Sequence, residues 1–360
     1  MHNNKRKHTH TLRNVFFAFI LLILLGGAAY GITKYRGVKD SINSSFKPSG
    51  VSKERDVSEQ LKNKKPISIL LLGTDTGSYD RDYKGRTDSM MVVTLNPKTK
   101  KTSITSIPRD TAVNIPGYKS ESPAKINAAY AYGEVGTSIK TVQKLLNIPI
   151  DFYALINLGG LKKVVDKVGG VDITPSQNFK WLGYSFKKNK KTHMNGSRAV
   201  AYAGMRYSDP NGDYGRQTRQ REVLMAIVHK SGSISTLLNQ SFINSLSSQT
   251  QTDLTFDDLT VIAKDYRAVR KHTSETHLQG NSEEVAKQSM EVVKKAELQR
   301  VTNFVRENLN LSKAKTGNIE FNPSTQSSTT NKTVEDINNI GVQSNLKSDS
   351  SKENDSSDGY

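Results

Sequence analysis

The feature that most constrains this chain is an apolar segment at residues 15–32, which contains no charged side chain and directly follows a basic N-terminus. Its length lies near the lower end of the roughly 17–25 residues that a helix needs to cross a bilayer. Residues 1–14 contain Lys5, Arg6, Lys7 and Arg13 and no acidic residue. A core helix is seldom this uniformly apolar beside a basic tail, so we expect a transmembrane signal anchor at residues 15–32.

A cleaved signal peptide is the alternative interpretation of the same segment. Ala29, Tyr30 and Gly31 place small residues in a pattern that a signal peptidase can accept. The apolar run is long for a signal peptide, which favours an uncleaved anchor. Basic residues flank the segment on both sides, so the positive-inside rule alone does not set its orientation.

Composition narrows the classes of partner and of chemistry. The chain has 52 Lys and Arg residues against 34 Asp and Glu residues, a formal charge of +18. A field of that sign favours phosphate-bearing lipids, wall polymers or nucleic acid, without choosing among them. Because the chain has 0 Cys, disulfides, thiolate metal sites and a cysteine nucleophile are excluded.

Three further regions follow the apolar segment. Residues 33–65 are polar and mixed in charge, which indicates a juxtamembrane stalk. Residues 66–311 interleave strand and helix patterns and predict one α/β domain. Residues 312–360 are rich in Ser, Thr, Asn and Lys, and we expect a disordered polar tail because such a segment buries little apolar area.

The domain is expected to contain a mixed sheet. Residues 67–72 form an apolar run typical of a strand buried on both faces. Residues 89–95 and 102–107 predict two strands that the turn residues 96–100 join as an antiparallel hairpin. More strands are predicted at 150–158 and 171–174, and helices at 126–132, 139–146, 197–203, 217–230, 256–266 and 282–309.

Two carboxylates are predicted at the ends of strands. Asp75 follows the first strand, and Asp88 opens the second, just after Arg86. If that strand extends back to Arg86, Arg86 and Asp88 lie on the same side of it. Mg²⁺ commonly takes one or two carboxylates together with phosphate oxygens and water, so Asp75 and Asp88 are candidate Mg²⁺ ligands. A surface ion pair between Arg86 and Asp75 is the alternative.

Further arginines are expected near the same edge of the sheet. Pro108 ends the second strand of the hairpin and directs Arg109 toward that edge. Arg206 precedes a loop rich in Gly and Pro, and Asp213 in that loop is a candidate helix cap.

The helix that follows presents Arg216, Arg219 and Gln220 on one face, whereas Arg221 is expected to face solvent. Guanidinium groups offer paired donors to phosphate, and a helix N-terminus adds its dipole and its N–H groups. A basic helix alone also suits nucleic acid or a membrane surface. Since no His or Ser is placed as a nucleophile, direct attack by an acceptor hydroxyl fits phosphoryl transfer best.

The chain resembles the LytR-CpsA-Psr family of Gram-positive bacteria over about residues 65–311. The matching segments occur in family order: ILLLGTD (69–75), GRTDSMMVVTLNP (85–97), SIPRD (106–110), KINAAYAYG (125–133), VGGVDI (168–173), AYAGMRYSDPNGDYGRQTRQR (201–221) and TDLTFDDL (252–259).

The resemblance implies a single mixed-sheet α/β domain outside the cell membrane, carried by one transmembrane helix with its N-terminus in the cytoplasm. Members of the family use Mg²⁺ and join undecaprenyl-pyrophosphate-linked glycopolymers, such as teichoic acid or capsular polysaccharide, to peptidoglycan, releasing undecaprenyl phosphate. Nucleic acid is then not an expected partner. The alternatives are a hydrolase of the lipid pyrophosphate and a non-catalytic receptor for anionic wall polymer or lipid.

The resemblance also implies residue roles. Asp75 and Asp88 match the aspartates that organise Mg²⁺. One departure is Gly204, which stands where the family usually has an arginine before Arg206. The positions that contact pyrophosphate are matched by Arg86, Arg109, Arg206, Arg216 and Gln220. These five residues and Arg219, which belongs to the same motif, are the candidate catalytic residues.

Overall fold

The computed structural model describes residues 39–40, 42–74, 85–205, 209–231, 247, 250–266, 268–269 and 272–321. Of the predicted site residues, Asp75 and Arg206 lie outside these ranges, as does the predicted anchor at residues 15–32. Within the described ranges, no helix combines the length and the apolar character that a bilayer span requires.

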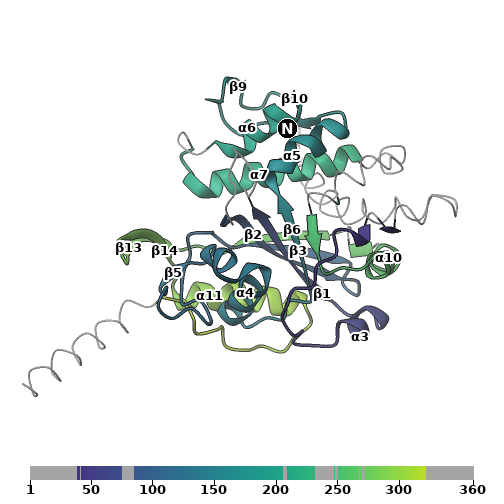
Figure 1. Ribbon diagram of the computed structural model, residues 1–360, viewed down its shortest axis with the longest axis vertical. Coiled ribbons are helices and arrows are strands. Elements are labelled where there is room, and N and C mark those ends of the chain that lie inside the picture. The colour runs from purple at the N-terminus through teal and green to yellow at the C-terminus, as the bar shows by residue number, and fades with distance from the viewer. Residues whose placement is uncertain are drawn as a thin grey trace, which may run out of the picture. The chain divides into compact units, whose positions relative to one another are not determined.

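A six-stranded mixed sheet forms the centre of the domain, in the order β11-β6-β1-β2-β3-β12 (Figure 1). β1 runs parallel to β6 and β3 to β12, whereas the β1–β2, β2–β3 and β6–β11 pairs are antiparallel. The hairpin and the mixed sheet predicted from the sequence are therefore confirmed. The strands are β1 (Ile67–Thr74), β2 (Thr87–Asn96), β3 (Lys101–Ser106), β6 (Phe152–Asn157), β11 (Thr250–Thr252) and β12 (His272–His277).

These strand directions bring distant parts of the chain to one edge of the sheet. The carboxyl ends of β1, β3, β6 and β12 meet there with the amino end of β2. We call this edge the rim. Side chains just beyond parallel strand ends point into the crevice where ligands bind in α/β proteins. The rim is thus the place to look for a site.

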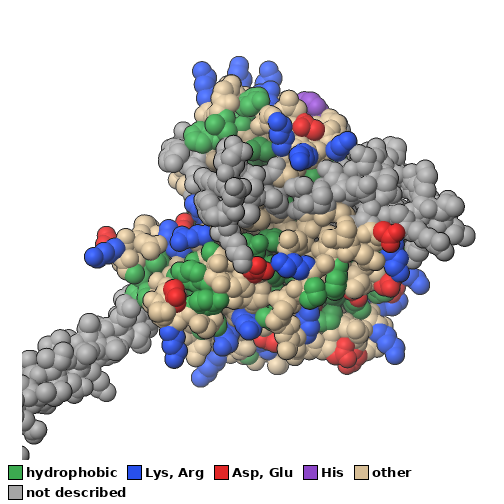
Figure 2. Space-filling model, in the orientation of Figure 1, with side chains coloured by type: hydrophobic (Ala, Val, Ile, Leu, Met, Phe, Trp, Pro, Cys, Tyr) green, Lys and Arg blue, Asp and Glu red, His purple; other side chains and the backbone are tan. Residues whose placement is uncertain are grey.

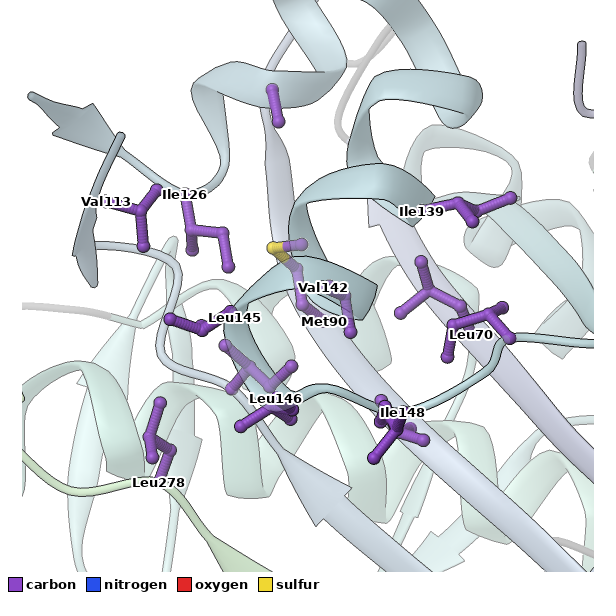
Figure 3. Close-up of a cluster of buried hydrophobic side chains, with 14 of the residues drawn as sticks. Leu70, Met90, Val113, Ile126, Ile139, Val142, Leu145, Leu146, Ile148 and Leu278 are labelled. Carbon is purple, nitrogen blue, oxygen red and sulfur yellow. The ribbon is translucent and has the colours of Figure 1, made fainter. Parts of the chain in front are cut away.

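Helices cover both faces of the sheet. α4 (Ala128–Leu146) and α11 (Lys295–Asn308) pack on one face, where Val142 of α4 points toward Met90 (Figure 3). α3 (Val57–Lys62) and α10 (Phe256–Asp265) contribute to the cluster on the other face, which includes Ile67 and Ile69. Because successive strand residues point to opposite faces, burial of both explains why β1 is apolar at nearly every position apart from Ser68.

A third apolar cluster builds a cap over the rim (Figure 1). The stacked rings of Phe179 and Phe186 and the buried Tyr202 lie at its centre. The cap consists of α5 (Leu158–Lys167), α6 (Gly196–Gly204), α7 (Gly212–Ser231), β7 (Val171–Ile173), β8 (Phe179–Trp181), β9 (Tyr184–Phe186) and β10 (Thr192–Met194). Two short sheets, β10–β7 and β8–β9, complete it.

The helix predicted at residues 282–309 is wrong in its first half. β13 (Asn281–Val285) and β14 (Gln288–Val292) form a hairpin, and α11 begins only at Lys295. Ala286 and Lys287 form the two-residue turn with φ of 49° and 59°. Two-residue hairpins favour such positive values, but usually through Asn or Gly. Since neither is present, the sequence carried no turn signal.

Two predicted helices are one element in the structure. The segments at 126–132 and 139–146 join as α4, which is kinked at Gly133 and Glu134, where φ and ψ leave the helical region. Gly133 has no room for a side chain, because a Cβ there would lie 2.0 Å from Thr137 Oγ1. A small hairpin, β4 (Ala112–Val113) with β5 (Ala124–Lys125), leads into this helix.

The ends of the domain extend beyond residues 66–311. In the segment assigned to a stalk, Ile42 and Leu61 are buried, and Phe46 bridges to Thr252 of β11. Arg55 forms an ion pair with the fully buried Asp151. After residue 311, the Gly317 N–H donates to the Leu145 carbonyl at 3.1 Å. The described parts of both segments therefore pack on the domain.

Candidate active site

Asp88 is the centre of the candidate site. It is the second residue of β2, it lies at the rim, and only 7% of its surface is exposed. Arg109 donates a hydrogen bond to Asp88 Oδ1, and Arg216 Nη2 lies 3.6 Å from the same oxygen. The three side chains come from β2, from the loop after β3 and from α7. The structure thus brings together three of the residues singled out from the sequence.

The buried carboxylate of Asp88 thus lies beside two guanidinium groups. Asp110 approaches Arg109 Nε at 3.5 Å, but it also pairs with Lys125 at 2.8 Å. Buried charges are tolerated when they are paired and hydrogen-bonded. Guanidinium groups in this setting can bind phosphate oxygens with two donors each.

One face of α7 supplies three of the predicted residues. Arg216, Arg219 and Gln220 are 1%, 2% and 5% exposed, which confirms that they share the inward face of the helix. Among the described residues, Gln220 Oε1 has no hydrogen-bond partner although it is buried. A buried polar atom left without a partner costs about 1–3 kcal/mol, so this oxygen is a candidate contact for a water or a ligand.

Arg219, a candidate site residue from the sequence, makes several contacts within the protein. Its Nε and Nη2 donate to the carbonyls of Tyr202 (3.1 Å) and Met205 (2.6 Å), and Nη1 donates to Asp209. Its guanidinium also lies 5.4 Å from the Phe179 ring centroid. These contacts occupy its donors within the protein. Arg219 therefore joins Tyr202 and Met205, at the end of α6, to Asp209.

Asp209 is the ion-pair partner of Arg219. Burial opposes ionisation of Asp209, yet hydrogen bonds from Arg219, the Asn211 N–H and Gln177 hold its pKa below the usual range. The carboxylate sits directly over Gly215, where an added Cβ would lie 1.8 Å from Asp209 Oδ2. Glycine at position 215 is thus required by this close approach.

The other predicted residues lie as follows. Arg86 precedes β2 and is exposed, whereas Asp88 is buried, because the strand begins only at Thr87. The expectation that both share one side of an extended strand is therefore not met. Asp213 lies within the first turn of α7, which begins at Gly212, so it is not the residue that precedes the helix. Asp75 and Arg206 lie outside the described residues.

Sequence reasoning missed two links between the cap and the rest of the domain. Arg221, expected to face solvent, donates to Ser106 Oγ at 2.7 Å and to Thr218 Oγ1 at 3.1 Å. Tyr214 donates to Glu291 of the β13–β14 hairpin. The position of Ser106 at the carboxyl end of a predicted strand could have indicated that its hydroxyl lies near the helix that carries Arg221. The misassigned hairpin concealed the second.

Basic side chains are also gathered on the outer surface of the cap, and they are the blue side chains at the top of Figure 2. Such a field raises the local concentration of anionic ligands. The exposed lysines of the cap are Lys162, Lys163, Lys167, Lys180, Lys187, Lys188, Lys190 and Lys191.

This fold and site define a class: an α/β domain with arginines grouped around a buried carboxylate at a sheet edge, an arrangement that suits a phosphate-bearing ligand. Comparison with known proteins then identifies the family. The LytR_cpsA_psr family model matches residues 32–307, and the chain belongs to the LytR-CpsA-Psr family.

Curated relatives and solved structures agree with this assignment. The chain is 39% identical over 297 residues to the polyisoprenyl-teichoic acid–peptidoglycan teichoic acid transferase TagU of Enterococcus faecalis, covering 82% of this chain and 96% of that protein. The Bacillus subtilis TagU is 35% identical, with 79% and 92% covered. A Streptococcus agalactiae crystal structure matches with a TM-score of 0.65 and 32% identity, covering 77% of this chain and 98% of that chain. A structure of TagT bound to LI-WTA matches with a TM-score of 0.57 and 28% identity, with 72% and 95% covered.

Proposed function

We propose that this chain transfers a polyisoprenyl-linked wall glycopolymer, such as teichoic acid, to peptidoglycan. Family membership and relatives named as transferases of this kind support the assignment. The observation that carries it is the buried Asp88 flanked by Arg109 and Arg216 at the rim. This arrangement suits a pyrophosphate group more than it suits an uncharged substrate.

The proposed reaction is a phosphoryl transfer with two substrates. An acceptor hydroxyl of peptidoglycan attacks the phosphorus attached to the glycopolymer and forms a new P–O bond. The bond from that phosphorus to the bridging oxygen breaks, and undecaprenyl phosphate leaves with the electron pair. The hydroxyl proton is released to solvent or to a neighbouring base. The products are a phosphodiester-linked polymer and the lipid monophosphate.

The chain's own residues act through charge and position. Arg109 and Arg216 neutralise negative charge on the phosphates, because guanidinium groups donate two hydrogen bonds to phosphate oxygens. Arg86 and Arg206 are proposed as further phosphate contacts, and Gln220 as a contact through its amide. Electrostatic stabilisation of this type supplies most of the catalysis in phosphoryl transfer.

Mg²⁺ is proposed as the cofactor. The described residues contain no group of three His, Cys, Asp or Glu side chains that could hold a metal ion. Mg²⁺ does not require one, because it commonly binds through one or two carboxylates, substrate phosphates and water. The buried carboxylate of Asp88 fits this requirement, and Asp75 is proposed as the second ligand. When bound, Mg²⁺ would supply charge neutralisation at the pyrophosphate.

The position of the domain is also a proposal. A signal anchor at residues 15–32 would hold the domain at the outer face of the cell membrane, where both the lipid donor and peptidoglycan are found. Protease treatment of intact protoplasts tests this topology. Cleavage of the domain without lysis is expected, and protection until lysis would contradict an extracytoplasmic domain.

The function is tested with the full chain in detergent and a synthetic undecaprenyl-pyrophosphate-linked oligosaccharide. Reactions run with Mg²⁺ or EDTA, each with and without peptidoglycan fragments. We expect undecaprenyl phosphate and a sugar–peptidoglycan adduct only with Mg²⁺ and acceptor together. Equal lipid phosphate release without acceptor would indicate a hydrolase. Donor binding without any product would indicate a receptor, which the loss of an arginine at Gly204 would suit.

A further inference from the structure

A second polar cleft of about 360 Å³ lies between the first turns of α7 and the carboxyl ends of β3 and β12. Residues after β7 complete its wall. We call it the α7 cleft. Its described lining residues include four amide side chains, three aliphatic hydroxyls, two aromatic rings and an arginine that does not pair with Asp209. They are Gln177, Asn211, Gln217, Gln279, Ser106, Ser176, Thr218, Tyr214, His277 and Arg221.

The lining is polar and carries little negative charge. The one carboxylate, Asp209, is held by Arg219 and is thereby neutralised. Amide side chains offer both donors and acceptors, and hydroxyls offer the same in one group. A ligand rich in hydroxyl and acetamido groups satisfies such a lining, since it too presents donors and acceptors in equal measure.

Tyr214 forms a fixed wall of the α7 cleft. Its hydroxyl donates to Glu291 of β14, and the Gly280 N–H donates to Glu291 Oε1 at 2.7 Å. The Tyr214 ring meets the His277 ring edge-on, with centroids 5.6 Å apart. Two separate elements, β12 and β14, thus hold this side chain in place, and side chains locked in this way make precise binding surfaces.

Arg221 gives the α7 cleft a positive charge. Within the described part of the chain, both of its hydrogen-bond partners are neutral hydroxyls, on Ser106 and Thr218. The guanidinium is therefore positioned by β3 and by its own helix without being paired directly to a carboxylate. A carboxylate on the ligand would meet a cation whose direction is already set.

The α7 cleft and the phosphate site share one helix. Arg216 lies beside Asp88 at the rim, whereas Tyr214, Gln217 and Arg221 line the cleft. Ser106 ends β3 at the cleft, and the loop that follows carries Arg109 to Asp88. Direct transfer requires both substrates to be held side by side at the same time. The two sites have this relationship.

We propose that the α7 cleft binds the acceptor, an N-acetylated amino sugar of peptidoglycan that carries a carboxylate. The amides would contact the acetamido and hydroxyl groups, and Arg221 would bind the carboxylate. This inference rests on the proposed transferase function, which supplies peptidoglycan as the second substrate.

The test compares Arg221→Ala and His277→Ala with the matched control His272→Ala. His272 and His277 are both exposed residues of β12, but they lie at opposite ends of the strand. Steady-state kinetics use the full chain, the synthetic lipid-linked donor and a soluble muropeptide fragment. Equilibrium binding of the same fragment is measured separately, without donor. We expect the Arg221→Ala variant to raise the acceptor KM and Kd on the order of tenfold, with the donor KM unchanged. The His277→Ala variant should show a smaller rise, and the control none.

The possible failures are distinguishable. If adducts form but neither variant changes acceptor KM or fragment binding, the acceptor assignment is overturned while the transferase function stands. If the variants raise the donor KM alone, the α7 cleft binds the donor sugar, and the acceptor assignment is again overturned. If no adduct forms under any condition, yet Arg221→Ala weakens fragment binding tenfold, the cleft assignment stands and the proposed function fails.

Discussion

The Arg216 guanidinium on α7 lies 3.6 Å from Asp88 Oδ1 at the start of β2, and both side chains are almost fully buried. Arg109 contacts the same carboxylate from a third element. Position in the fold, and not closeness in the sequence, thus creates the charged group that the proposed chemistry uses. Most of the predictions below test this group or the contacts that Arg219 makes with Asp209 and its neighbours.

Asp88→Asn separates the role of charge from the role of the carboxylate. Because the change removes a negative charge beside Arg109 and Arg216, metal-free binding of inorganic pyrophosphate should stay within about threefold of the parent or tighten. Turnover should fall at least about a hundredfold if the carboxylate holds Mg²⁺. Calorimetry and the turnover assay measure the two effects. Parent-like Mg²⁺-dependent turnover would remove Asp88 from the proposed mechanism.

Arg219→Ala should mainly destabilise the fold. Removing the guanidinium leaves Asp209 buried without its ion pair, a change that typically costs about 3–5 kcal/mol. Urea unfolding measures the loss. Arg306→Ala is the control, since Arg306 also donates to backbone carbonyls but is only partly buried. A stable Arg219→Ala protein with weakened pyrophosphate binding would restore Arg219 as a ligand residue.

Gly215→Ala tests the close approach of Asp209. In an ordinary helix interior this change stabilises by about 0.5–1 kcal/mol. Here the new Cβ would clash with the Asp209 carboxylate, so we expect destabilisation of about 1–3 kcal/mol. The sign of the change in unfolding free energy decides the matter, because a more stable variant would contradict the described position of Asp209 over Gly215.

Glu222→Gln tests the buried contact with Tyr202. The Tyr202 hydroxyl donates to Glu222 at 2.6 Å, and burial raises the Glu222 pKa above its ordinary value of 4.5. An acid with a raised folded pKa stabilises the fold below its unfolded pKa and loses that contribution as pH rises through the folded pKa. The variant should therefore match the parent near pH 4 and exceed its stability near pH 8. Equal differences at both pH values would contradict the assignment.

The sequence was most informative where apolar periodicity and strand ends coincide. The run at 67–72 and the hairpin at 89–107 were predicted because burial on two faces and turn residues leave clear patterns. The mixed sheet then follows, and with it the meeting of Asp88 and Arg109 at one edge. The shared face of Arg216, Arg219 and Gln220 followed from helical spacing alone.

Other features depended on contacts that no local pattern carries. The β13–β14 hairpin turns at Ala286 and Lys287, residues with no turn preference. Without a turn signal, the charged sequence of its strands was predicted to be part of a helix. Arg219 and Arg216 look equivalent in the sequence, and only the surrounding carbonyls and Asp209 separate their roles. Arg221 was assigned to solvent because its partner, Ser106, lies on a distant strand.

The central claim is that Arg216 and Asp88 form the site where glycopolymer is transferred to peptidoglycan. Mass spectrometry of the adduct formed from the synthetic donor and a peptidoglycan fragment tests it most directly, with parent, Arg216→Ala and Arg306→Ala proteins compared. We predict a phosphodiester-linked adduct with the parent and the Arg306→Ala control, and a loss of at least about a hundredfold with Arg216→Ala. An adduct formed equally well by a folded Arg216→Ala protein would contradict the account.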